Sequence, residues 1–271
     1  MAPDTWWRAY QTLRSFFQFW FVRKQIQSIP MPRPKAALPP PFRPYIFSRS
    51  QLRQLLIYAG RLERSKQRKC DAKTVQLLIL FTYSTGALVH EAIELRLSEI
   101  DFERQLIVLR RRDGEWRRQI PISKTTAHKL KEYIHSTLER RQGSDYVFLQ
   151  LDGRKVRRAS LLHNFRRLCL RLNIRQDHGI SITPGMHDLR HTFAVHCLDS
   201  WLVEGKNARQ MLPILSGYMG HVLLRSTEQY LDLVPNRFDK HVSRLAAEPG
   251  VRRHWSDWLS ASSVDRHCST A

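Results

Sequence analysis

Prolines cluster in the segment IPMPRPKAALPPPFRP, residues 29–44, and this segment sets the first limit on how the chain can fold. A proline lacks the backbone N–H that a helix needs, and it restricts the residue before it to extended conformations. The segment therefore predicts an extended linker. We expect one helix before it, in residues 1–28, the main folded domain after it, in residues 45–240, and a C-terminal tail in residues 241–271.

The chain is strongly basic. Its 271 residues include 45 Lys and Arg against 24 Asp and Glu, which gives a formal net charge of +21 at pH 7 and a pI near 10.6. So large an excess of positive charge repels itself unless a partner neutralises it. We therefore favour a polyanionic partner, most often nucleic acid, over a basic surface that has no specific partner.

Two features indicate the compartment. The chain has four widely spaced cysteines, Cys70, Cys169, Cys197 and Cys268. The absence of a CxxC pair or a dense cysteine framework is typical of a reducing, intracellular compartment. Residues 6–21 are rich in Trp and Phe, but Arg8 and Arg14 interrupt them and no small-residue cleavage site follows. They predict an amphipathic helix rather than a signal peptide or a membrane span, so we expect a cytoplasmic protein.

The hydrophobic periodicity after the linker is mostly helical. A capping-box spacing at Ser48 and Gln51 opens a helix through residue 63, a second helix ends near Gly86, and a third covers residues 91–100. Further helices are expected at residues 125–141, 160–172, 187–202 and 207–220, with a short helix at 225–233 and a strand at 145–151. With the hairpin described next, these patterns predict a fold that is mainly α with a small antiparallel β-sheet (α+β).

The segment QLIVLRRRDGEWRRQIPI, residues 105–122, contains two β-rich runs around Asp113-Gly114, which predicts a β-hairpin. Its arms carry five arginines, Arg110, Arg111, Arg112, Arg117 and Arg118. Arginines on a hairpin can simply keep an exposed edge from aggregating. In a chain this basic we favour contacts between these arginines and a DNA backbone.

The segment MHDLRHTF, residues 186–193, concentrates cationic and proton-transferring groups in little more than one helical turn. His187 and His191 have the i, i+4 spacing of a zinc-hydrolase helix, with His196 or His221 as a conceivable third ligand. Asp188 is one methylene shorter than the glutamate of such enzymes, and Arg190 would place a fixed positive charge beside the metal. The zinc hydrolase is therefore the weaker alternative. A second alternative is that these residues have only a structural role, as a helix face held by capping and surface ion pairs.

A second segment, YMGHVLLRSTEQYL, places His221 after Gly220 and Tyr230 nine residues later. Tyrosine is a poor nucleophile at its ordinary pKa of about 10, so its use needs a cationic site that also binds phosphate. Residues 187–191 would supply that site. The alternative is a tyrosine that only packs in the core.

These segments together resemble the tyrosine recombinases, also called phage-type integrases. HDLRH, residues 187–191, is similar to the family's H-x-L-R-H box, and Gly220-His221 to its L-G-H box, with Met219 in place of Leu. Tyr230 lies at the offset of the family's nucleophile.

The resemblance extends from about residue 44 to about residue 240. YSTGALVHEAIELRLSEIDF, residues 83–102, resembles the family's first box, and the hairpin ends in IPI where the family has V-P-L. PYIFS and LPILSGYMGHV look most similar to recombinases carried by transposons and other mobile elements, which implies DNA recombination, integration or transposition.

The resemblance implies four catalytic residues with two in support. They are Tyr230, Arg190, His187 and His221, supported by His191 and Glu91. Tyr230 would attack a DNA phosphodiester and form a 3′-phosphotyrosyl bond, while Arg190 holds non-bridging oxygens and the histidines donate hydrogen bonds and move protons. No metal or other cofactor is implied. The implied partners are double-stranded DNA and further recombinase subunits, identical or different, with no membrane and no small-molecule substrate.

Two positions depart from the family pattern. Leu88 stands where the first box has an arginine, and Asp113 aligns with the hairpin lysine that acts as a general acid. Loss of one preorganised donor typically lowers a rate by about 10²–10³-fold. The sequence therefore predicts impaired strand cleavage, with an accessory DNA-binding subunit as the alternative.

Both ends also differ from the family pattern. Residues 1–28 look like the last helix of an N-terminal DNA-clamping domain, which suggests truncation. Residues 244–259 would be a segment that docks on another protomer.

Overall fold

A computed structural model describes residues 3–31, 43–62, 70–110, 117–178 and 180–234. The chain divides into two compact units, Met1–Arg43 and Pro44–Ala271. The first unit contains helix α1 (Pro3–Val22), on which Trp6 stacks on Tyr10 with 5.3 Å between ring centroids. Among the described residues, no helix is long and apolar enough to cross a membrane.

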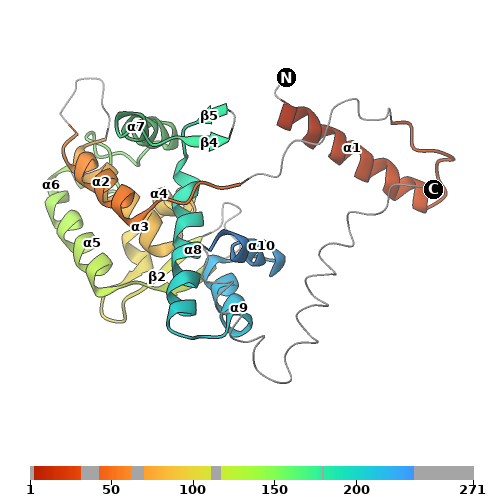
Figure 1. Ribbon diagram of the computed structural model, residues 1–271. Helices are drawn as coiled ribbons and strands as arrows, with labels where there is room; N and C mark the ends of the chain where they lie inside the picture. Colours follow the sequence, from red (N-terminus) through yellow and green to blue (C-terminus); the bar gives the residue numbers. More distant parts are fainter. Residues whose placement is uncertain (1–2, 32–42, 63–69, 111–116, 179, 235–271) are drawn as a thin grey trace. The chain divides into compact units, whose positions relative to one another are not determined.

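The second unit is mainly helical with a small antiparallel sheet, which confirms the predicted fold class (Figure 1). Its α-helices are α2 (Arg49–Gly60), α3 (Ala72–Thr85), α4 (Val89–Glu94), α5 (Lys124–Ser136), α6 (Leu138–Arg141), α7 (Arg158–Arg171), α8 (Met186–Val203), α9 (Ala208–Met219) and α10 (Arg225–Glu228). Two 3-10 helices, η1 (Leu97–Glu99) and η2 (Leu231–Leu233), complete the helical elements of the described residues.

Local sequence signals set the ends of α2 and α3. Ser48 Oγ accepts the Gln51 N–H at 3.2 Å and the Gln51 side chain accepts the Ser48 N–H at 2.9 Å, so the predicted capping box is confirmed. Asp71 caps α3, which ends at Gly86 in the left-handed conformation, with φ +60°.

The sheet contains β1 (Ile100–Asp101), β2 (Leu106–Arg110) and β3 (Arg117–Pro121), in that order and antiparallel. Ile107 pairs with Ile120, and both are buried, so one face of the predicted hairpin packs on the core. The predicted turn at Asp113-Gly114 lies outside the described residues.

Two predicted elements are wrong. The helix expected over residues 91–100 ends at Glu94, because Leu95 is extended and the Leu97 N–H donates to the Asp145 carbonyl at 2.8 Å. The strand expected at 145–151 is reduced to isolated bridges such as Arg96 to Tyr146. A short pair, β4 (Gln176–His178) and β5 (Ile180–Ile182), was not predicted.

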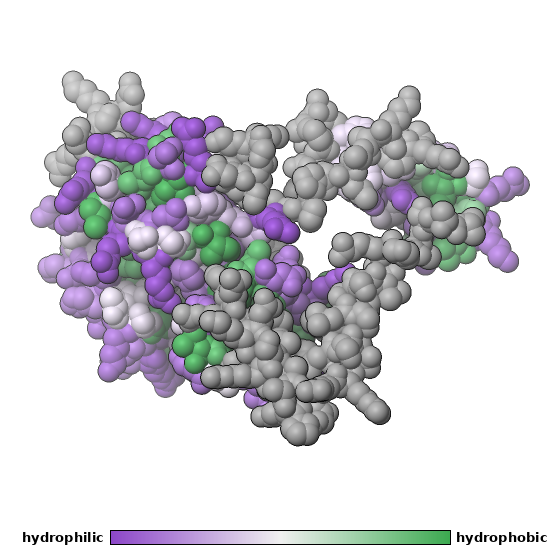
Figure 2. Space-filling model, in the orientation of Figure 1, coloured by the Kyte–Doolittle hydropathy of each residue, from purple (hydrophilic) through white to green (hydrophobic). Residues whose placement is uncertain are grey.

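Helix α3 is central to the fold and packs against α2, α5 and α8. The larger core cluster includes Phe47, Phe81, Phe148 and Phe165. A second cluster joins α8 and α9 and includes Tyr230. Hydrophilic side chains cover most of the visible face of this unit in Figure 2, with smaller hydrophobic areas between them.

Candidate active site

Asp188 anchors the start of α8, the helix that carries the MHDLRH segment. Its Oδ2 accepts the Gly185 N–H at 2.7 Å, and its Oδ1 accepts the Tyr45 N–H at 3.1 Å. Both oxygens therefore serve the backbone at the helix N-terminus, where a carboxylate is favourable. Within the described ranges, no cluster of three or more His, Cys, Asp or Glu side chains is suited to holding a metal ion.

Arg190 is clamped between the ends of two helices. Its Nη1 donates to the Gly86 carbonyl and its Nη2 to the Met219 carbonyl, both at 2.7 Å. Helix C-termini carry partial negative charge, so they hold a guanidinium well. Burial and the nearby Arg118 lower the pKa of Arg190 to about 10, so it keeps its charge at neutral pH.

Tyr230 lies between α10 and η2 and is only 2% exposed. Its Oη lies 2.9 Å from His191 Nδ1, and its ring centroid is 6.2 Å from that of His221. Burial raises the pKa of the phenol, while Arg190 acts in the opposite direction. The hydroxyl is therefore protonated at neutral pH, with a histidine nitrogen beside it.

Three histidines belong to this site: His191 and His221 lie beside Tyr230, and His187 lies beside His191. Burial and the neighbouring cations lower the pKa of His191 to about 3 and that of His221 to about 4. The pKa of His187 is lowered by the same causes, and its ring lies 4.6 Å from that of His191. Thr227 Oγ1 lies 2.8 Å from His221 Nδ1 and orients that ring. All three rings are therefore neutral at pH 7 and ready to gain a proton when an anion enters.

Glu91 on α4 joins the site to the sheet. Its Oε2 accepts the Leu88 N–H at 2.7 Å, and its two oxygens form a bidentate ion pair with Arg118. The Arg118 side chain is only 10% exposed, and its Nε donates to the Tyr218 carbonyl at 3.1 Å. We predicted that Arg118 contacts the DNA backbone, and the structure places its side chain inside the site.

The other hairpin arginines have different surroundings. Arg110 pairs with Glu99 and is partly exposed. Arg117 begins β3, and Arg111 and Arg112 lie outside the described residues, as does Asp113.

The structure brings Tyr230, Arg190 and the three histidines together from segments that the sequence had singled out. Arg118 was the residue whose position the sequence did not reveal. Gly86 and Gly220, both with positive φ, were the available signals, because each marks a helix end whose carbonyls face the arginines.

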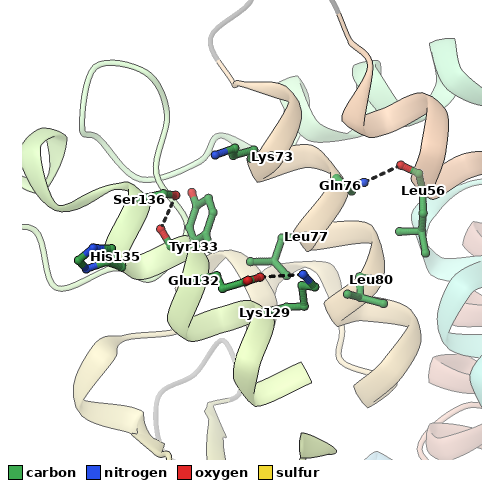
Figure 3. A pocket seen from close by; sticks show the side chains of 10 residues that line it. All are labelled: Leu56, Lys73, Gln76, Leu77, Leu80, Lys129, Glu132, Tyr133, His135 and Ser136. Atoms are coloured by element: carbon green, nitrogen blue, oxygen red, sulfur yellow. Dashed lines mark hydrogen bonds and ion pairs between the residues drawn. The ribbon is translucent and has the colours of Figure 1, made fainter. Parts of the chain in front are cut away.

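A groove of about 540 Å³ lies away from this site (Figure 3). It runs between α3 and α5, where Lys129 faces Glu132 and the Gln76 amide donates to the Leu56 carbonyl. It shares no lining residue with the site at the other end of α3.

Residues 47–237 match the phage integrase family, which is more than half of the chain. The chain therefore belongs to the phage integrase family, the site-specific tyrosine recombinases. It is 28% identical over 235 residues to the integrase/recombinase y4rB of Sinorhizobium fredii, covering 83% of this chain and 69% of the relative. It is 29% identical over 220 residues to tyrosine recombinase XerA of Thermococcus kodakarensis, covering 81% and 67%. The chain thus spans about two thirds of the length of these relatives.

Solved structures give the same fold. The Tn1549 transposon integrase bound to transposon right end DNA has a TM-score of 0.63 at 18% identity, covering 91% of this chain and 81% of the other. The crystal structure of XerA recombinase has a TM-score of 0.58 at 19% identity, covering 87% and 74%. The XerH recombinase in a post-cleavage complex with its difH substrate has a TM-score of 0.57 at 20% identity, covering 74% and 53%.

Proposed function

We propose that this chain cleaves and rejoins double-stranded DNA through a 3′-phosphotyrosyl intermediate on Tyr230. The observation that carries the proposal is the Tyr230 hydroxyl beside a neutral His191, at 2.9 Å, with Arg190 close enough to act on its pKa. A neutral imidazole can accept a phenolic proton, and a fixed guanidinium can hold the phosphate that the phenolate attacks.

The chemical step balances without a cofactor. The Tyr230 Oη forms a bond to the phosphorus, the bond from phosphorus to the 5′-oxygen breaks, and its electron pair leaves with that oxygen. The phenolic proton passes to His191 or a neighbouring histidine, and the 5′-oxygen takes up a proton to become a hydroxyl. Attack by a 5′-hydroxyl on the phosphotyrosyl bond reverses the step and rejoins the strand.

Arg190 and the histidines have distinct roles in this proposal. Arg190 is immobilised by two backbone carbonyls, so it is preorganised to hold non-bridging oxygens. His221 and His187 are neutral in the free protein, and a bound phosphate would favour their protonated forms, each then with two N–H donors.

Three features support DNA as the partner. The net charge of +21 favours a polyanion, and the similar Tn1549 integrase and XerH structures contain DNA. We also propose that the chain works with further recombinase subunits and that the helix in residues 1–28 belongs to a DNA-clamping domain. The predicted docking segment at 244–259 lies outside the described residues.

The second candidate function is an accessory DNA-binding subunit without strand cleavage. Leu88 favours it, because an alkyl side chain cannot hold a phosphate oxygen where the family pattern has an arginine. Both candidates predict DNA binding, and only strand cleavage separates them.

Covalent trapping tests the proposal. The purified protein is incubated with nicked suicide substrates that carry the DNA ends flanking its own gene, and a protein–DNA adduct is sought on a denaturing gel. We expect an adduct that Tyr230→Phe abolishes.

Tyr83→Phe is the matched control, because Tyr83 pairs with His196 Nδ1 at 3.0 Å in a similar tyrosine–histidine contact without Arg190 beside it. Its adduct should persist. Salt-sensitive DNA binding without any adduct would favour the accessory subunit instead.

A further inference from the structure

We infer that Arg118 supplies a second guanidinium to the scissile phosphate and so takes over the role that Leu88 cannot fill. The inference rests on the proposed strand cleavage. It assigns a phosphate-binding role inside the site to a residue of strand β3, which the family pattern does not mark as the missing arginine.

Arg118 and Arg190 are bound to consecutive peptide units. The Arg118 Nε donates to the Tyr218 carbonyl at 3.1 Å, and the Arg190 Nη2 donates to the Met219 carbonyl at 2.7 Å. Both carbonyls belong to the last turn of α9, which accepts hydrogen bonds from cations. Two guanidinium groups therefore lie side by side at one helix end.

The pKa shifts of Arg190 and His221 also indicate that Arg118 lies close to them. Arg118 is the charged neighbour with the largest lowering effect on the pKa of Arg190, and it lowers the pKa of His221 together with Arg190. A monoanionic phosphodiester bound at Arg190 and His221 would thus meet Arg118 as well, and it would relieve the repulsion among these groups.

Donors remain for such an anion. A guanidinium has five N–H groups, and Arg118 gives three of them to Glu91 and Tyr218. One N–H on each terminal nitrogen has no acceptor among the described residues. Nη1 lies over Gly220, where an added Cβ would be 3.1 Å away, and Gly220 precedes His221 in the chain.

Glu91 positions this guanidinium. It is 1% exposed and holds Arg118 by two bonds while it accepts the Leu88 N–H. The guanidinium is therefore held in one orientation, and its remaining N–H groups point in fixed directions. Glu91 also offsets part of the positive charge, so we expect Arg118 to contribute less than Arg190.

The test compares two substrates that differ by one charge at the cleavage position. One carries the ordinary phosphodiester, and the other a methylphosphonate, in which a methyl group replaces one charged non-bridging oxygen. The rate of adduct formation is measured for the full chain and for Arg118→Gln. We expect a loss of about 10–10²-fold on the phosphodiester, below or at the typical value for one preorganised donor. The methylphosphonate should show less than a third of that loss, because the charge that Arg118 balances is absent.

Arg140→Gln is the matched control. Arg140 forms a similar, part-buried pair with Asp71, and it contacts none of the site residues. It should slow the reaction by the same factor on both substrates or not at all.

A second variant tells loss of phosphate binding apart from a structural effect of removing Arg118. Leu88→Arg added to Arg118→Gln should restore cleavage of the phosphodiester at least about 10-fold if the site lacks only a guanidinium. Equal losses on the two substrates, with no rescue by Leu88→Arg, would overturn the inference and leave Arg118 a structural residue. A wild-type chain without any adduct would overturn the proposed cleavage and this inference with it.

Discussion

His191 makes the stability of the folded chain depend on pH. Its ring is part-buried beside His187, Arg190, His221 and Tyr230, and these surroundings lower its pKa to about 3. In the unfolded chain the pKa returns to about 6.5. Between these values the unfolded state binds the proton more readily, so stability is complete above about pH 6.5 and falls as the pH drops.

The size of the effect follows from the shift. At pH 5 the pH is about 1.5 units below the pKa of His191 in the unfolded chain, so that histidine is mostly protonated there. In the folded chain His191 stays neutral at pH 5. One pKa unit corresponds to about 1.4 kcal/mol. Proton uptake by His191 in the unfolded chain should therefore lower the free energy of unfolding by about 2 kcal/mol between pH 7 and pH 5.

The assay is urea denaturation of the wild type and of His191→Asn at pH 7 and pH 5. Asparagine keeps an acceptor near the position of Nδ1 for the Tyr230 hydroxyl and does not titrate. We expect the variant to lose about 2 kcal/mol less than the wild type on acidification. His163→Asn, at an exposed histidine of α7, serves as the control and should follow the wild type. Identical pH dependence in wild type and His191→Asn would refute the burial argument.

Three further predictions concern backbone, core and partner. Gly220→Ala places a Cβ 3.0 Å from the Arg118 side chain at φ +71°, and should lower the free energy of unfolding by about 1–3 kcal/mol and slow cleavage. Gly205→Ala, with φ +77° but open space, should show only the strain part in the same urea titration and leave cleavage intact. Thr192→Val removes the acceptor of the Phe47 N–H at 3.0 Å, and should destabilise the chain by about 1–3 kcal/mol in thermal or urea unfolding. DNA affinity, measured by fluorescence anisotropy across salt concentrations, should fall linearly on a log–log plot; a flat line would contradict phosphate neutralisation.

The position of Arg118 changes the interpretation of Leu88. From the sequence alone the apolar residue predicts a site that has lost a guanidinium. In the structure, its backbone N–H and Arg118 share the same carboxylate, Glu91. Glu91 therefore links the backbone of Leu88 to a guanidinium, and this guanidinium belongs to Arg118 on β3.

The sequence by itself determined the elements whose ends depend on neighbours in the chain. Ser48 and Gln51 cap α2, and Gly86 and Gly220 end α3 and α9, because capping bonds and positive φ involve only a few adjacent residues. The ordered boxes around His187, His221 and Tyr230 likewise sufficed to predict the family.

Only the tertiary structure determined the features that depend on contacts between residues far apart in the chain. The expected helix over 91–100 stops because Leu97 bonds to Asp145, 48 residues further on, a competition that periodicity within a short window does not contain. Tyr230 meets His191 from 39 residues away, and Arg118 meets Glu91 and Tyr218 from 27 and 100 residues away. An arginine on a hairpin can face solvent or the core with the same local sequence. Its direction was fixed by the buried carboxylate and the helix end that lie opposite it after folding.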